Sequence, residues 1–144
     1  MANSDTVKLL KECNSGIKMG ISAIEEVLPS IKDERFKEIL DKCLEEHKIL
    51  GEDTARVLDS LGDDGKEPHT IAKGMAWLKT NVMLAVEDTD KTAADLLTDG
   101  CHMGIKSINR YLNQYKDADE KTKGIVKEII RIEENLAQDI RVYL

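Results

Sequence analysis

Apolar residues recur every three or four positions along the first 61 residues of this chain, and the spacing predicts two amphipathic helices. The first runs from residue 5 to about residue 28, and Pro29 helps to end it. The second starts near Asp33 and Glu34, because acidic side chains suit the positive end of a helix, and it stops at the turn 62–65. The predicted inward positions are Leu10, Cys13, Ile17, Ile21, Ile24 and Leu28 in the first helix and Phe36, Leu40, Cys43, Leu44, His47, Leu50, Thr54, Val57, Leu58 and Leu61 in the second.

The rest of the chain predicts one short helix and two long ones. The short helix covers 70–86, and the long helices cover about 89–115 and 118–142. Asp117 with Glu120 three residues later predicts a capping box before the last helix. The predicted inward positions are Ile71, Met75, Leu78, Val82 and Ala85 in the short helix and Leu97, Cys101, Ile105, Ile108 and Leu112 in the helix after it.

An internal repeat with an offset of 88 residues relates the two ends of the chain. The segment 13–18 (Cys-Asn-Ser-Gly-Ile-Lys) returns as 101–106 (Cys-His-Met-Gly-Ile-Lys), and 45–47 (Glu-Glu-His) aligns with 133–135 (Glu-Glu-Asn). The repeat predicts two duplicated helical hairpins, 5–62 and 89–144, joined by the crossover helix 70–86 in one domain, 1–144. The repeated Gly16 and Gly104 predict close helix approach at both positions.

Length and composition set the fold class. The 144 residues fit one domain, and with 34% charged and 3% aromatic residues the chain favours helix over sheet. Four helices of roughly 25 to 30 residues match the proportions of a four-helix bundle. The prediction is an all-α, ferritin-like up-down four-helix bundle with an extra short helix in the crossover connection.

Net charge and hydropathy argue against two classes of partner, nucleic acids and membranes. A net charge of −7 without clusters of Lys and Arg predicts no binding to nucleic acid. No apolar run is long enough to span a bilayer and the first residues do not resemble a signal peptide, so we expect a cytoplasmic protein without a membrane partner. Three cysteines without an export signal predict free thiols. No nucleophile elbow, phosphate loop or Cys-x-x-Cys occurs, so no catalytic residues are predicted.

The chain resembles a bacterial ferritin-like family related to rubrerythrins and mostly of unknown function. The resemblance covers nearly the full length and rests on the two Gly-Ile-Lys segments, the Glu-Glu-His at 45–47, the Leu-Gly-Asp-Asp-Gly-Lys-Glu-Pro turn at 61–68 and the Met-Ala-Trp-Leu at 75–78. It implies a bundle whose ancestors held two irons with one Glu from each of two helices and a Glu-x-x-His from each of the others.

The implied iron ligands are largely replaced in this sequence. The positions carried over from the family are Cys13, Cys101, Leu44, His47, Ile132 and Asn135, of which only His47 keeps its type. Leu44 and Ile132 cannot coordinate a cation, so the resemblance implies that the diiron site has been lost. A diiron protein that handles peroxide or oxygen requires instead that glutamates 12, 45, 46, 133 and 134 point inward.

The cysteines and the histidine leave several interpretations open. Two thiolates and one imidazole suit Zn or Fe(II), so Cys13, His47 and Cys101 form a candidate metal site, with Glu46 or Glu134 as a fourth ligand only if the bundle is rotated. The favoured interpretation has no cofactor: the cysteines pack as small apolar residues, and His47 hydrogen-bonds to Asn135 or to water. A Cys13 to Cys101 disulfide is a further alternative.

Two more features each allow two interpretations. Asp99 and His102 have metal-pair spacing but are expected to be a solvated surface pair. The crossover helix, around Met75, Trp77 and Met83, either packs in its own monomer, which we favour, or forms a homodimer surface. The leading functional hypothesis is a cytosolic structural or interaction protein that is not an enzyme. The alternative is a mononuclear metal-binding protein.

Overall fold

A computed structural model of the chain describes residues 3–62 and 89–144, and all four of the long elements in that part are helices. They are α1 (Ser4–Val27), α2 (Glu34–Ser60), α4 (Thr89–Gln114) and α5 (Glu120–Asp139). Short 3₁₀ turns follow α1 at Leu28–Ser30 and α5 at Arg141–Tyr143. No strand occurs among the described residues, so the all-helical class and the bundle architecture are confirmed.

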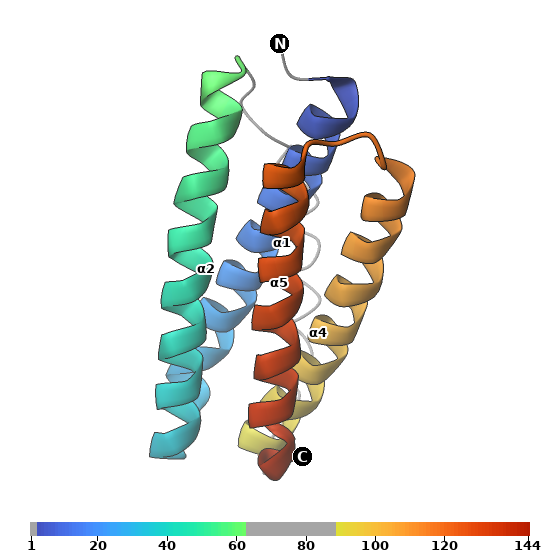
Figure 1. The fold of residues 1–144 in the computed structure, drawn as a ribbon. Coiled ribbons are helices and arrows are strands. Elements are labelled where there is room, and N and C mark those ends of the chain that lie inside the picture. Colours follow the sequence, from blue (N-terminus) through green and yellow to red (C-terminus); the bar gives the residue numbers. More distant parts are fainter. Residues whose placement is uncertain (1–2, 63–88) are drawn as a thin grey trace.

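The helices stand side by side in two antiparallel pairs, α1 with α2 and α4 with α5 (Figure 1). The two pairs also meet along α1 with α4 and along α2 with α5. Helix α2 ends at the end of the bundle where α1 begins, whereas α4 begins at the opposite end, so α2 and α4 run parallel (Figure 1). The predicted crossover helix 70–86, with Met75, Trp77 and Met83, lies outside the described residues.

Polar side chains cap three of the four helices. Asn3, Asp33 and Asp119 each accept a hydrogen bond from the backbone N–H three residues further on, which satisfies a donor that the first helical turn leaves free. The start predicted at Asp33 is confirmed. The capping box predicted at Asp117 is wrong, because Asp117 lies in the preceding turn, where its backbone bonds to the side chains of Asn3 and Asp5.

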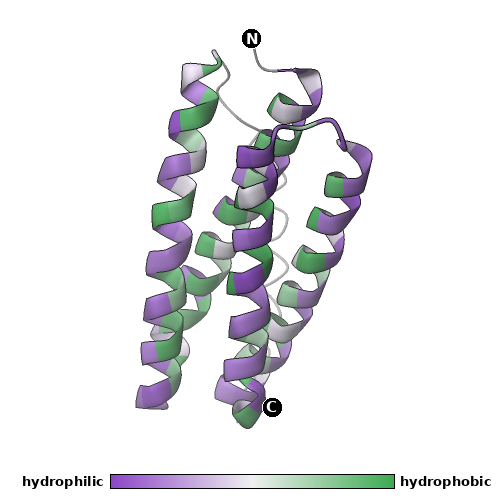
Figure 2. Ribbon diagram, viewed as in Figure 1, coloured by the Kyte–Doolittle hydropathy of each residue, from purple (hydrophilic) through white to green (hydrophobic). Residues whose placement is uncertain are grey.

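The apolar faces of the helices point inward and the polar faces outward (Figure 2). In α1, α2 and α4, the residues predicted to face inward are buried or half-buried, except Leu61, which sits at the exposed end of α2. The core forms two clusters. The first core cluster includes Ile24, Phe36, Leu40, Cys43, Leu97, Cys101, Ile132 and Leu136, and the second comprises Leu9, Cys13, Ile17, Ile108, Ala118, Val126 and Ile129.

Among the described helices, none combines sufficient length with sufficiently apolar composition to cross a bilayer.

Candidate functional site

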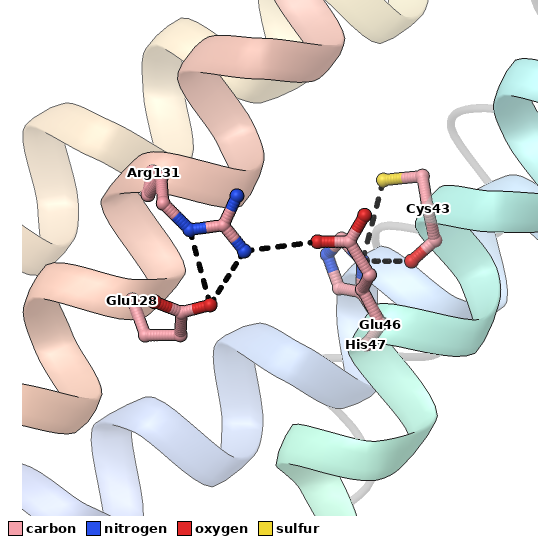
Figure 3. A network of polar contacts seen from close by, with 5 residues as sticks. All are labelled: Cys43, Glu46, His47, Glu128 and Arg131. Atoms are coloured by element: carbon pink, nitrogen blue, oxygen red, sulfur yellow. Dashed lines mark hydrogen bonds and ion pairs between the residues drawn. The ribbon is translucent and has the colours of Figure 1, made fainter.

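His47 is the most deeply buried ionisable group of α2 that has a charged partner on another helix. Its side chain is 4% exposed, and its Nε2 lies 2.8 Å from Oε1 of Glu133 on α5. On the other side of the ring, Nδ1 lies 2.8 Å from the carbonyl oxygen of Cys43 and 3.5 Å from the Cys43 sulfur, one turn earlier in α2 (Figure 3). Both ring nitrogens therefore have protein partners.

The partners of His47 fix where its protons lie. A carbonyl oxygen only accepts hydrogen bonds, so Nδ1 carries a proton and donates it to Cys43. The Nε2 proton is then needed for the bond to the Glu133 carboxylate. Burial alone lowers the pKa of His47, but hydrogen bonds and electrostatic interactions with Cys43 and Glu133 outweigh it and raise the pKa to about 10. His47 is thus an imidazolium at neutral pH, neutralised by Glu133.

Glu133 also connects this pair to α4. The Cys101 thiol hydrogen-bonds to the Glu133 carboxylate, and its pKa is raised by burial, by the charge of Glu133, by that bond and by Cys43. Cys101 therefore stays protonated and donates its S–H. The Glu133 side chain is 15% exposed, so water screens this bonding only in part. One carboxylate on α5 bonds to side chains from both α2 and α4.

Helix α1 contributes a glycine that makes room for the histidine ring. A methyl group built on Gly20 would lie 2.7 Å from Nε2 and 2.8 Å from Cδ2 of His47, closer than real Cβ contacts come. The close approach predicted at Gly16 and Gly104 is wrong. Gly16 is exposed with no atom near its missing methyl group, and at Gly104 the nearest neighbour, a Glu133 oxygen, is at an ordinary 3.8 Å.

Cys13 lies apart from this group in the second core cluster. It is completely buried, and burial, with a further contribution from the charge of Glu12, raises its pKa to about 12. Cys101 and Cys43 belong to the first core cluster. All three cysteines are free thiols in this structure, so it contains no disulfide between Cys13 and Cys101.

Three other predicted ligand positions, Asn135, Glu134 and Glu46, do not join this group. Asn135 is exposed, so its predicted pairing with His47 is wrong, and Glu133 takes that role instead. Glu134 is exposed as well. Glu46 binds Arg131 of α5, which also binds Glu128, so it belongs to a surface ion-pair network (Figure 3). The predicted solvated pair is exposed at both of its positions, Asp99 and His102.

Cys43, His47, Cys101 and Glu133 together form what we call the cluster. Its hydrogen bonds determine which chemistry these residues can perform. Metal ligands must offer free lone pairs, but here the imidazole and the Cys101 thiol hold protons that are bonded to protein acceptors. Within 3–62 and 89–144, no three His, Cys, Asp or Glu side chains are grouped so that they could hold a metal ion. The metal site predicted on Cys13, His47 and Cys101 stays a prediction, and the placement of Cys13 gives it no support.

Next to the cluster, the surface between α2 and α5 is hollowed into an open groove of about 350 Å³. Cys43 lies on its wall together with apolar residues, and the rim is charged. Neither Cys13 nor Cys101 lines this groove. The apolar residues of the wall are Ile39, Ile132 and Leu136, and the charged residues are Arg35, Glu38, Lys42, Glu46, Arg131 and Asp139.

Comparisons with protein-family models, with curated proteins and with solved structures gave no match to this chain.

Proposed function

We propose that this chain is a structural or interaction protein, a ferritin-like bundle in which a hydrogen-bonded cluster of side chains occupies the place of a dimetal centre. The observation that carries the proposal is the bonding of His47, whose two ring nitrogens are both used by protein acceptors. In a ferritin-like bundle, a long crossover connection joins two helices that run parallel. The parallel course of α2 and α4 therefore supports the ferritin-like part of the proposal.

In this proposal the cluster fixes how the four helices fit together. Glu133 must meet His47 on α2 and Cys101 on α4 at once, and His47 must lie over Gly20 of α1. Sliding α5 by one turn, about 5.4 Å, would break both bonds of Glu133 and leave a charge buried without a partner. An apolar core alone would tolerate such a shift more readily, because dispersion contacts are not directional.

Metal content is the first test of this function. Untagged protein purified without oxygen should contain no stoichiometric metal by elemental mass spectrometry, and added Zn²⁺ or Fe²⁺ should leave its melting temperature unchanged. One Zn or Fe per chain that is lost in the Cys13→Ser, Cys101→Ser double variant would support the mononuclear alternative. Two irons per chain would support a diiron protein. Either result would overturn the proposal.

The oligomeric state bears on whether the protein acts through a second copy of itself. A homodimer through the crossover segment remains a prediction, because Met75, Trp77 and Met83 lie outside the described residues. Sedimentation analysis of the full chain measures it directly, with Trp77→Ala as the variant that weakens such a dimer and exposed Met103→Ala as its control.

A further inference from the structure

We infer that Cys43 is a modification site: a reactive thiol that forms a mixed disulfide with a small amino-acid or peptide disulfide bound in the groove between α2 and α5. This chemistry goes beyond the proposed structural role, because it adds a covalent ligand. Three observations support it: the hydrogen-bond partners of the Cys43 sulfur, the access to it and the charges around it.

The hydrogen bonding favours a nucleophilic sulfur at Cys43. The Nδ1–H of His47 points to both the carbonyl oxygen and, 3.5 Å away, the sulfur of Cys43 (Figure 3). Since Nδ1 is a donor, the sulfur acts as the acceptor in this contact. Glu133 on Nε2 keeps the ring in its charged form. Cationic neighbours of this kind are what make particular cysteines reactive.

Cys43 differs from the other two cysteines in how accessible its sulfur is to a ligand in the groove. Cys43 lines the groove and is 6% exposed, whereas Cys13 is 0% and Cys101 is 2% exposed and neither lines it. Burial raises the pKa of both of those thiols, so they remain in the unreactive protonated form. The chain thus contains two internal controls for the reactivity of the third cysteine.

The rim of the groove carries charges that suit an amino-acid-based ligand. Arg35 is paired with Glu38, and Arg131 with Glu46. Lys42 and Asp139, by contrast, form no ion pair with any residue in the described part of the chain. Among the described residues, this leaves one cation and one anion of the rim without an ion pair beside an apolar wall, which match the carboxylate and ammonium groups of a disulfide such as cystine or glutathione disulfide. Lys42 directly precedes Cys43, so it can draw the carboxylate towards the sulfur.

The reaction is a thiol–disulfide exchange. The Cys43 thiolate attacks one sulfur of the bound disulfide, a new S–S bond forms, and the old S–S bond breaks. The leaving thiolate takes up the proton that the Cys43 thiol gave up, so one thiol is consumed and one is released. The small disulfide is the oxidant, and no other reactant is needed.

The experiment treats the folded full-length protein with glutathione disulfide and follows each cysteine by peptide mass spectrometry. Cys43 should acquire a glutathionyl group at least about tenfold faster than Cys13 or Cys101, and the three should react alike in urea. Equal rates in the folded protein, or modification only as fast as unfolding, would overturn the inference. This comparison needs no variant and is independent of metal content.

Two matched pairs of variants test the causes separately. Glu133→Gln should slow the reaction of Cys43 several-fold, whereas Glu134→Gln, the same change at the exposed neighbour, should not. Lys42→Ala should slow the reaction with glutathione disulfide but not with uncharged hydroxyethyl disulfide, and exposed Lys48→Ala, which does not line the groove, is its control. If Lys42→Ala slows both reagents equally, the groove does not select its ligand by charge.

Discussion

Replacing Glu133 by leucine should destabilise the bundle much more than replacing Glu133 and His47 together. Removing one partner leaves the other buried and charged, which typically costs about 3 to 5 kcal/mol. Because the side chains are 4% and 15% exposed, we expect the lower end of that range, about 3 kcal/mol, for Glu133→Leu. At this chain length that loss corresponds to a fall of about 10 °C in melting temperature.

The double variant removes both charges, and apolar residues of similar size often replace a buried pair without loss. The free energy of unfolding of the His47→Leu, Glu133→Leu protein should therefore lie within about 1 kcal/mol of the wild type. Urea unfolding followed by circular dichroism measures the free energy of unfolding of the wild type, the two single leucine variants and the double variant. Glu134→Leu, at the exposed neighbouring position, should change stability by less than about 0.5 kcal/mol. A double variant as unstable as the sum of its single variants would refute the pairing.

The same pair predicts how stability varies with pH. The pKa of His47 rises from 6.5 in the unfolded chain to about 10 in the folded protein. Its stabilising contribution is therefore complete below pH 6.5 and is lost as the pH rises towards 10, at up to about 1.4 kcal/mol per pH unit. We expect this fall between pH 6.5 and 8.5 in the wild type and not in the double leucine variant. A higher range is less suitable, because cysteines in the unfolded chain, whose ordinary pKa is 9.0, also titrate there.

Two further predictions compare like substitutions at unlike positions. Gly20→Ala should destabilise the protein, because the added methyl group meets the ring of His47. Gly16→Ala should stabilise it by about 0.5 to 1 kcal/mol, because alanine has the higher helix propensity. Thermal unfolding of both variants distinguishes the two effects, and equal shifts in melting temperature would contradict the packing at Gly20. Asp119→Ala should cost about 1 kcal/mol by removing the cap of α5, and Asp117→Ala, in the turn before it, should cost less than half as much in the same assay.

The fold could largely be predicted from the sequence, since the spacing of apolar residues states directly which face of each helix is buried. The helix ends were harder. Asp117 and Asp119 are both good capping residues, and the choice of Asp119 depends on contacts of the turn with Asn3 and Asp5, more than a hundred residues away. Local sequence carries no information on such contacts.

The site was predicted only in part. His47 and Cys101 were placed correctly on inward faces. Glu133 was expected inward only as an iron ligand of the diiron alternative and not as the partner of His47, because it lies one residue, about 100°, from inward Ile132. The repeat did not help, since its counterpart Glu45 is exposed. The sequence does contain one indication of the site, a glycine on the inward face of a helix. Gly20 lies three residues after Ile17 and four before Ile24, and a glycine there indicates that another side chain needs the space.

The most direct test of the His47–Glu133 pair is the protonation state of His47, read from nitrogen-15 NMR of the histidine side chains and assigned with the His47→Leu variant. Near neutral pH we expect both ring nitrogens to carry protons that exchange slowly, because each proton is bonded to a buried acceptor. A His47 ring with one unprotonated nitrogen, whether the ring is neutral or bound to a metal, would contradict a charged His47–Glu133 pair in this core.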